Sequence, residues 1–472
     1  MVFSRLYFLF AFFPLFFLTY YLFKKRSHRN IILFVFSLVF YAWGEPVYIF
    51  LMMASLTSDY FIGMGIGWAR ERDRGKLAKR LMILSMVTNL ALIGVFKYSG
   101  FLVMTFNSIA GTSIHPPSPA LPIGISFYTF QIMTYIIDVY KGKIQPQKNY
   151  LFLGSYLCAF PQLVAGPIVR YETIAHEIEG RRENMVDFSE GMRRFTAGLA
   201  KKVLIANTMA SVCDAVLNDA SPVKFGAIGM WIAVIAYTLQ IYYDFSGYSD
   251  MAIGIGRMMG FHYPENFNYP YIAKSVGEFW RRWHMTLSTF FRDYVYIPLG
   301  GNRVSMPRWI FNISVVWFLT GLWHGAGWTF ILWGVYFGVL LVIEKLVLSK
   351  KFLQIPVLNR VYAIAAFVFG WVIFRAESLS DVGMILRTMF GASGSGSMSN
   401  LAAAGIITPA ALLMFVAGVA LSIPVSRKIK AYIEEKKPSL SFLIDAGSVA
   451  ALLCSAMVLA GGAYNPFIYF RF

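Results

Sequence analysis

The chain has 472 residues, of which 57% are hydrophobic and only 14% are charged. Soluble proteins carry about 25% charged residues, so this composition excludes a soluble globular protein and indicates an integral membrane protein. The formal net charge of +18 comes from Lys and Arg residues in short clusters between apolar runs. That arrangement is typical of cytoplasmic loops and does not indicate a nucleic-acid-binding surface.

Twelve apolar stretches approach the roughly 20 residues that a helix needs to cross a bilayer. They lie at residues 5–23, 31–44, 47–67, 81–97, 121–140, 194–217, 225–247, 309–323, 328–347, 360–375, 405–425 and 441–462. We therefore predict an all-α, polytopic membrane protein with about 11–12 membrane helices and a single domain over residues 1–472. The first stretch, Leu6 to Phe23, is expected to remain as a membrane helix and not to be cleaved as a signal peptide. It is long enough to cross, and no small-residue cleavage site follows it.

Basic residues are distributed unevenly between the connecting segments. Positive clusters follow at residues 24–29, 70–80, 350–351 and 427–437, whereas segments 98–120, 376–404 and 461–472 hold only Arg387 and Arg471. Positive loops remain in the cytoplasm, so this asymmetry predicts an N-terminus and a C-terminus on the outside.

Two apolar regions are too irregular to be simple spans. Residues 150–172 are broken by Pro161, Gly166 and Pro167, and residues 263–303 carry Pro264, Pro270 and Pro298. Irregular backbone at membrane depth survives only where protein or a watery cavity covers it. We expect both to be re-entrant or cytoplasm-facing segments that line an interior chamber. Residues 384–404, which include the Gly/Ser run 391–397, are expected to form a flexible outside loop.

The strongest candidate for a functional residue is His324, which lies in the apolar stretch from Trp317 to Trp328. An ionisable side chain at membrane depth is a functional candidate by default. The alternative is a neutral core histidine bonded to a backbone carbonyl. Glycines at 321, 325 and 327 allow backbone or ligand to come close, and tryptophans at 317, 323, 328 and 333 are expected to wall the site. Residues 309–323 predict a helix of roughly 22 Å that breaks at Gly325.

A second cluster, residues 278–288, alternates tryptophan with arginine and contains His284. Such a pattern is typical of an amphipathic helix at the membrane interface. It also fits a cytoplasmic dock for a phosphate-bearing cofactor, because Arg281 and Arg282 could bind phosphate bidentately. His284 is then either a second catalytic histidine or an interfacial one.

Other polar residues give weaker signals. Asp244 and Asp250 are expected to cap a helix end or to join the chamber, with capping favoured for Asp250. Cys158, Cys213 and Cys454 lie in apolar context without disulfide or metal-ligand spacing, and we predict small core residues. No Gly-x-Ser-x-Gly elbow, Walker loop or zinc spacing supports a hydrolase, an ATPase or a metalloenzyme.

Several motifs in order carry a resemblance that no single motif would. They are residues 161–168, 243–260, 279–284, 299–303 and 321–326. With these, the chain resembles the membrane-bound O-acyltransferase (MBOAT) family, and more narrowly its bacterial AlgI/PatA-like branch, the membrane subunits of alginate and peptidoglycan O-acetylation. Teichoic-acid D-alanyltransferases are more distant relatives. The likeness covers essentially the whole chain, with a core motif region at about 120–347.

The resemblance implies a ring of helices around a thin funnel, with His324 as the essential histidine and His284 as the second one. It implies acetyl-CoA as a cytoplasmic substrate, with no permanently bound cofactor. For this donor we predict binding by Lys274, Arg281, Arg282 and Trp323, the arginines through the anionic phosphates. The resemblance also implies a bacterial inner-membrane location and a periplasmic SGNH-type partner that modifies the polysaccharide. Segments 376–404 and 464–472 are plausible contact surfaces for that partner.

Two alternatives remain open at this point. A secondary transporter of an acetyl donor or a polymer would place His324 in a permeation path, although such transporters usually show internal repeats and none is visible. A transferase of another acyl group, such as D-alanine or a fatty acid, is the other. The acceptor polysaccharide, alginate, peptidoglycan or another glycan, is not encoded in any motif.

Overall fold

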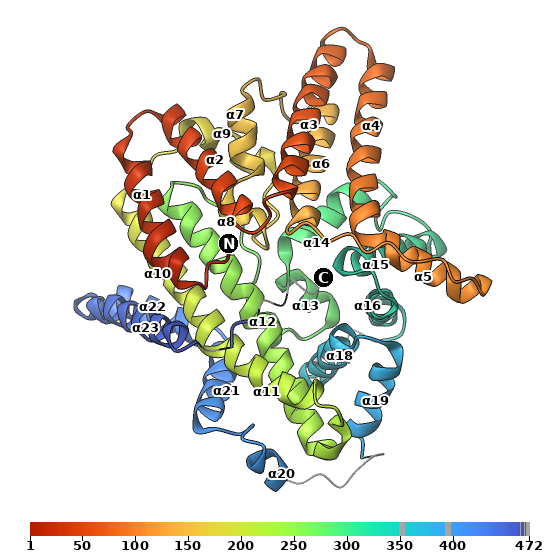
Figure 1. Ribbon diagram of the computed structural model, residues 1–472, viewed down its shortest axis with the longest axis vertical. Helices are drawn as coiled ribbons and strands as arrows, with labels where there is room; N and C mark the ends of the chain where they lie inside the picture. The colour runs from red at the N-terminus through yellow and green to blue at the C-terminus, as the bar shows by residue number, and fades with distance from the viewer. Residues whose placement is uncertain (349–354, 392–397, 463, 467, 469–472) are drawn as a thin grey trace. The chain divides into compact units, whose positions relative to one another are not determined.

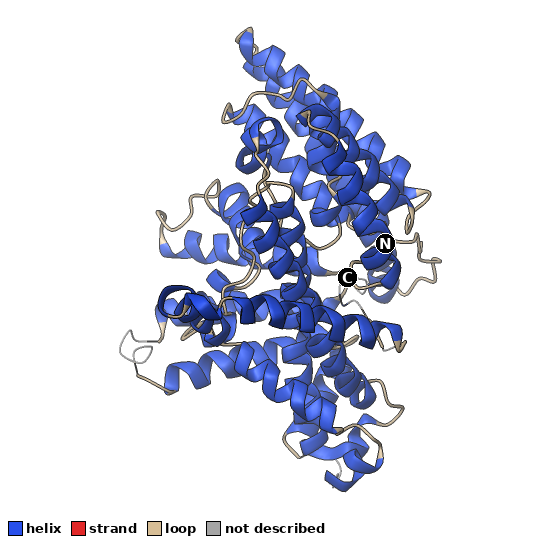
Figure 2. Cartoon of the chain, turned by 90° about the vertical axis from the view of Figure 1, so that its left-hand side faces the viewer, coloured by secondary structure: helices blue, strands red, loops and turns tan. Residues whose placement is uncertain are grey.

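The structure is a computed structural model that describes residues 1–348, 355–391, 398–462, 464–466 and 468. The described residues form helices joined by loops, and none of them forms a strand (Figure 2). The predicted all-α class is therefore confirmed.

The chain packs as two compact units. Unit 1 comprises Met1–Phe195 and Met251–Pro264, and unit 2 comprises Thr196–Asp250 and Glu265–Phe472. The long helix α12 (Gly226–Met258) contributes to both.

Unit 1 is built from the N-terminal helices, coloured red to yellow in Figure 1. In chain order they are η1 (Phe8–Phe12), α1 (Phe13–Leu22), α2 (Arg26–Ala42), α3 (Tyr48–Glu71), α4 (Gly75–Ile93), η2 (Gly94–Tyr98), α5 (Ser99–Ala110), α6 (Ile125–Lys141), α7 (Tyr150–Leu157), α8 (Phe160–Leu163), α9 (Tyr171–Gly180) and the first part of α10 (Met185–Ala200). Phenylalanines fill its core. The Phe160 ring lies 5.1 Å from that of Phe16 and 5.4 Å from that of Phe40, which ties α8 to α1 and α2.

The region 150–172 is broken, as its prolines predict. Helix α7 ends at Leu157, and α8 is a single turn that begins one residue before Pro161. Gly166 closes the following turn so tightly that a Cβ atom there would lie 2.5 Å from Cα of Gln162. Residues 153–169 are all buried, so protein covers this irregular backbone and satisfies the requirement for such a segment in a membrane protein.

Unit 2 holds the remaining elements. They are η3 (Lys201–Ala206), α11 (Asn207–Leu217), η4 (Pro222–Phe225), most of α12, η5 (Pro270–Ile272), α13 (Val276–Arg282), α14 (Met285–Phe291), η6 (Arg292–Tyr296), α15 (Met306–His324), α16 (Trp328–Leu346), α18 (Leu358–Arg375), α19 (Leu379–Met389), α20 (Met398–Ala403), α21 (Pro409–Leu421), α22 (Val425–Lys436), η7 (Pro438–Leu440) and α23 (Phe442–Ala460). The predicted irregularity of residues 263–303 is confirmed, because only short helices form there. The core of unit 2 is rich in tryptophan, with Trp280, Trp283, Trp317, Trp333 and Trp371 in one cluster.

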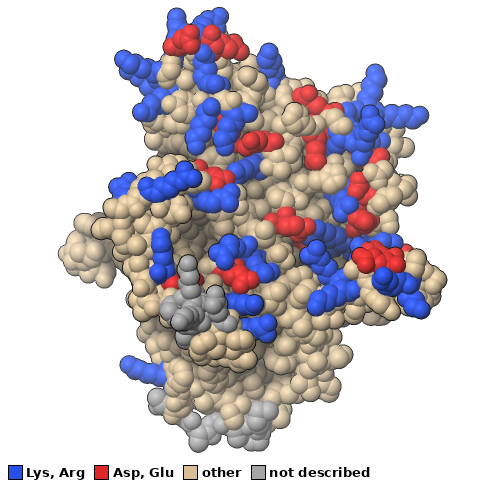
Figure 3. All heavy atoms as spheres, turned by 180° about the vertical axis from the view of Figure 1, so that it is seen from behind, with Lys and Arg blue, Asp and Glu red and all other residues tan. Residues whose placement is uncertain are grey.

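Among the described residues, six helices are long and apolar enough to cross a membrane, or seven if the bent pair α21–α22 is one span. The six are α3, α4–η2–α5, η4–α12, α16, α18 and η7–α23. This number is smaller than the 11–12 expected, because several apolar stretches fold as shorter or mixed helices; residues 8–22, for example, form only η1 and α1. On the face in Figure 3 the charged side chains gather in patches and leave broad uncharged areas, as a lipid-facing surface requires.

Two further expectations are corrected. Residues 384–404 are not simply a flexible loop, because they contain the end of α19 and all of α20; residues 392–397 of their Gly/Ser run lie outside the described residues. Cys454 is exposed on α23 instead of lying in a core, because that helix exposes nearly all of its apolar side chains, whereas Cys158 and Cys213 are buried as predicted.

Candidate functional site

His324 is the last residue of α15. The chain then turns through Gly325, whose backbone is extended, and begins α16 at Trp328. The two helices lie side by side (Figure 1) and approach closely: a Cβ atom at Gly321 would lie 2.4 Å from the carbonyl oxygen of Phe330, and one at Gly334 would lie 2.3 Å from that of Trp317. Glycine at 321 therefore serves helix packing. It holds the end of α15, and with it His324, against α16.

Aromatic rings surround the His324 imidazole, which is 5% exposed. Its centroid lies 4.9 Å from the rings of Trp323 and Trp333 and 5.1 Å from that of Phe374, in each case edge-on. A small cavity of about 10 Å³ adjoins the imidazole and is lined by Ile241, Trp283, His324, Trp333, Trp371, Phe374 and Ile468. A cavity of that size holds roughly one water molecule. The setting is dry and apolar around one ionisable group.

The tryptophan wall is only partly the one expected. Trp323 and Trp333 contact His324, whereas Trp317 packs behind Trp333 at 6.0 Å, and Trp328 is 52% exposed. The exposure of Trp328 follows from its position as the first residue of α16, directly after the glycine turn. The remaining tryptophan walls come from Trp283, which belongs to the cluster at residues 278–288, and from Trp371, which the sequence did not single out.

His284 lies at the junction of α13 and α14, and it is 1% exposed. Its backbone has φ 44° and ψ 52°, in the left-handed region that residues other than glycine rarely adopt. Backbone strain of this kind, about 1–3 kcal/mol, persists where the surrounding structure enforces it, often at functional sites. The imidazole packs edge-on against Phe245 at 4.6 Å and Trp323 at 5.6 Å. Trp323 therefore contacts both histidines.

Asn266 determines which nitrogen of His284 carries the proton. The backbone N–H of Thr286, which can only donate, lies 3.3 Å from Oδ1 of Asn266, so this atom is an acceptor. The Thr286 hydroxyl donates to it as well, and Nδ2 of Asn266 donates to Oγ of Ser249. Nδ1 of His284 lies 3.1 Å from the same Oδ1 and must therefore donate. Nε2 is left with the lone pair, and it has no hydrogen-bond partner among the residues that the structure describes.

Burial also keeps His284 neutral. It lowers the pKa of the imidazole to about 3, because a charged ring would lose its hydration in this apolar setting. His284 lies outside the six candidate spans. A neutral imidazole with a fixed tautomer and a buried, unbonded Nε2 can accept a hydrogen bond from a reacting group.

The predicted donor residues lie close to His284 in the chain, on α13 or just before it. Arg281 and Lys274 are exposed, whereas Arg282 forms an ion pair with Glu278, with 2.8 Å between Nη2 and Oε1. The same helix buries Trp280 and is followed by the buried Trp283. It therefore has the amphipathic character that the alternating pattern indicated.

The expectation for Asp250 was wrong. Helix α12 continues to Met258, so neither Asp244 nor Asp250 is at a helix end. Asp250 forms an ion pair with Lys201, with 2.6 Å between Oδ2 and Nζ, and Asp244 pairs with Lys202. Other contributors were missed: Asn266, Trp371, Phe374 and Ile468. Trp371 and Phe374 share a helix face by their spacing, but no pattern in the sequence indicates that this face meets His324.

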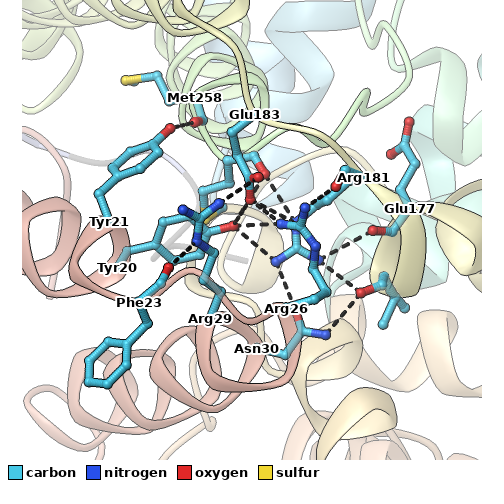
Figure 4. Close-up of polar contacts among 12 residues, drawn as sticks. Tyr20, Tyr21, Phe23, Arg26, Arg29, Asn30, Glu177, Arg181, Glu183 and Met258 are labelled. Carbon is cyan, nitrogen blue, oxygen red and sulfur yellow. Dashed lines mark hydrogen bonds and ion pairs between the residues drawn. The ribbon is translucent and has the colours of Figure 1, made fainter.

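Unit 1 contains a second large cluster of buried polar groups, centred on Arg181 and Glu183 (Figure 4). Every nitrogen of the Arg181 guanidinium donates to at least one oxygen. The acceptors are Tyr20, Asn30, and the carbonyls of Glu177, Ile178 and Met259. The Glu183 carboxylate accepts from Tyr20 at 2.7 Å and pairs with Arg26 and Arg29. Among the described residues these groups bond chiefly to one another, as in a network that stabilises a fold.

Comparisons with known proteins bear on the site. The family model of the membrane-bound O-acyltransferases matches residues 125–385, which include both histidines. The probable alginate O-acetylase AlgI of Azotobacter vinelandii is 38% identical, over the full length of both chains. A peptidoglycan O-acetyltransferase of Helicobacter pylori is 34% identical, over 82% of this chain and 79% of its own. A teichoic acid D-alanyltransferase of Bacillus subtilis is 30% identical, over 56% of this chain and 71% of its own.

Proposed function

Because the chain belongs to the membrane-bound O-acyltransferase family and is a multi-pass membrane acyltransferase, we propose that it passes acetyl groups from cytoplasmic acetyl-CoA to the outside of the inner membrane, where an extracytoplasmic polysaccharide is O-acetylated. The observation that carries the proposal is the position of His324, a buried imidazole at a helix end beside a dry aromatic cavity. The full-length similarity to alginate O-acetylases favours an exopolysaccharide as the acceptor.

His324 acts as the general base in this proposal. It removes the proton from the attacking hydroxyl as the new C–O bond forms at the acetyl carbonyl. The C–S bond of the thioester then breaks, and the CoA thiolate takes up a proton. The partial negative charge at the C-terminus of α15 favours an imidazole that has accepted a proton. Positioned bases of this kind contribute about 10²- to 10⁴-fold in rate.

The aromatic walls have a second task, which is to keep water out. A thioester beside a histidine is hydrolysed if water has access, and exclusion of water from a closed site suppresses such side reactions. The cavity beside His324 is lined by one ionisable residue and six apolar or aromatic ones. His284 supports the reaction through Nε2, on the other side of their shared neighbour Trp323.

On the donor side, we assign the phosphates of acetyl-CoA to Arg281, Arg282 and Lys274, with Trp323 next to the reacting group. Because Arg282 is already paired with Glu278, the exposed Arg281 is expected to matter more. Arg281→Gln should raise KM for acetyl-CoA with little change in kcat, as the loss of uniform binding does. Arg282→Gln is the matched variant. A fall in kcat at unchanged KM would instead place Arg281 in the chemical step.

The proposal includes a periplasmic SGNH-type partner that completes the transfer, with the chain termini on the periplasmic side. The test is to give purified full-length protein in nanodiscs acetyl-CoA alone, and then acetyl-CoA with polymer, without and with the partner. Slow release of CoA thiol by the chain alone, and polymer acetylation only with the partner, is the expected result. Efficient acetylation of polymer by the isolated chain would refute the relay and leave the acyltransferase assignment standing.

A further inference from the structure

A buried ion pair in unit 2 has no part in the chemistry above. Nζ of Lys202 lies 2.8 Å from Oδ1 of Asp244, and the two side chains are 2% and 1% exposed. Burying two charges is costly unless further hydrogen bonds satisfy them. Here each charged group forms one further hydrogen bond with the C-terminal tail. Nζ of Lys202 donates to the carbonyl of Pro466, and the backbone N–H of Ile468 donates to Oδ2 of Asp244 over 2.9 Å.

Two further contacts hold the same tail residues. The Tyr464 hydroxyl donates to Oδ2 of Asp214 over 2.9 Å, and Nδ2 of Asn207 donates to Oδ1 of Asn465 over 3.1 Å. The partners lie on η3, α11 and α12, all within unit 2. The described tail residues are therefore fixed at four points by groups more than 200 residues away in the chain.

Ile468, in the anchored part of the tail, lines the same cavity as His324. The Ile468 side chain is 4% exposed and forms one wall of the cavity that adjoins the imidazole. The other walls come from helices: Ile241 on α12, Trp333 on α16, and Trp371 and Phe374 on α18. The buried charges thus place an aliphatic side chain of the tail within the candidate active site.

We infer that Ile468 is a specificity-determining residue that restricts the acyl group to acetyl. The inference rests on the proposed function. The carbonyl carbon of a bound thioester must lie about 3–3.5 Å from the hydroxyl that His324 activates, so its alkyl chain must occupy the space next to the imidazole. That space is comparable with one methyl group, and Ile468 is one of its walls. Each extra methylene in such a pocket is worth about 10- to 200-fold in discrimination.

The experiment compares full-length variants in nanodiscs by the ratio of kcat/KM for propionyl-CoA to that for acetyl-CoA. Ile468→Ala should raise the ratio at least 10-fold, and Ile468→Val should raise it less. Ile385→Ala is the matched control, since Ile385 is also 4% exposed but lies on α19 and does not line this cavity. A merely structural loss lowers both activities together, so the control should leave the ratio unchanged.

A second variant tests the anchor. Lys202→Met combined with Asp244→Leu removes both charges without leaving one of them unpaired in the core. If the ion pair positions Ile468, this double variant should raise the propionyl-to-acetyl ratio as Ile468→Ala does. A wild-type ratio in Ile468→Ala and in the double variant, or a wild type that uses propionyl-CoA as well as acetyl-CoA, would overturn the inference and leave the proposed function intact. A wild type that turns over neither thioester would overturn both.

Discussion

The molecule contains two buried polar regions that differ in how fully their groups are satisfied. In the Arg181–Glu183 cluster of unit 1, each guanidinium nitrogen and the carboxylate have partners, in a network that joins α1, α2, α9 and the end of α12. Beside His284 in unit 2, one hydrogen bond to Asn266 holds Nδ1 of the imidazole, and Nε2 has no hydrogen-bond partner among the described residues. A fully satisfied network stabilises a fold, whereas a partly satisfied and rigidly held group is available for chemistry.

From this distinction we expect substitution of the histidines at the candidate site to remove activity without unfolding the protein. The largest expected effect is that of His324→Gln, which should lower acetyl transfer by about 10²- to 10⁴-fold, the usual contribution of a positioned base. Thioester turnover in nanodiscs and ester content of the glycan measure it. His262→Gln makes the same exchange at a largely exposed histidine and should leave both at the wild-type level. Full ester content with His324→Gln would remove His324 from the mechanism.

The reverse is expected in unit 1. Glu183→Ala leaves Arg181 and Arg26 without their counter-charge and should lower the free energy of unfolding by about 3–5 kcal/mol. Thermal unfolding in detergent measures that loss. The activity per folded molecule should not change, because the network contains no reacting group. A fall in activity at unchanged stability would mean that the cluster takes part in the reaction.

A smaller effect is expected from Asn266, the residue that positions His284. Asn266→Ala removes the acceptor for Nδ1 and should lower kcat by roughly 10- to 100-fold, the value of one hydrogen bond to a buried group. Asn266→Asp retains the acceptor but adds a charge that favours the imidazolium form, so the acidic limb of the pH–rate profile should move to higher pH. Ser249→Ala, which removes only the contact to Nδ2, is the milder control. Identical pH profiles for Asn266→Ala and Asn266→Asp would reduce Asn266 to a packing role.

The smallest expected effect is a difference in how the two regions make the free energy of unfolding depend on pH. The pKa of His284 is lowered by burial to about 3, so below its usual 6.5 the unfolded chain binds a proton that the folded chain refuses. His284 therefore does not change the free energy of unfolding above pH 6.5, and it lowers that free energy by about 1.4 kcal/mol for each pH unit below 6.5. Burial raises the pKa of Glu183, but the hydrogen bonds from Arg26 and Tyr20 outweigh it and lower the pKa overall, so its contribution is lost only below about 4.5.

Thermal unfolding at pH 7.0 and 5.5 tests this difference. His284→Gln should lose less stability over that interval than the wild type, by about 1.4 kcal/mol. Glu183→Gln should show the wild-type slope over the same interval, although it starts from a lower stability. If the free energy of unfolding changed equally between pH 7.0 and 5.5 in the wild type and in His284→Gln, His284 would not be held neutral.

Much of this protein was determined by local features of its sequence. Composition alone indicates a membrane protein, because its few charges and long apolar stretches suit the hydrocarbon core of a bilayer and not water. The helical structure is interrupted near Pro161 and at Gly166 and Pro167, as these residue types predict. His324 is recognisable as a candidate because its neighbours in the sequence are apolar. The glycine turn after it ends α15 at the predicted residue. Each of these effects acts within a few residues, and so it can be seen in the sequence.

The tertiary structure decided what each site residue touches. Asn266 meets His284 across 18 residues, Ile468 meets Asp244 across 224, and Trp371 joins the cavity from a separate helix. In the sequence Asp250 resembles a helix-capping residue, but α12 continues past it and Asp250 forms an ion pair with Lys201. Such contacts depend on how helices pack in three dimensions, and packing leaves no periodic pattern along the chain. For that reason the sequence singles out His324 as the candidate base, and only the fold shows that Asn266 orients the neighbouring His284 and that Ile468 lines the cavity beside His324.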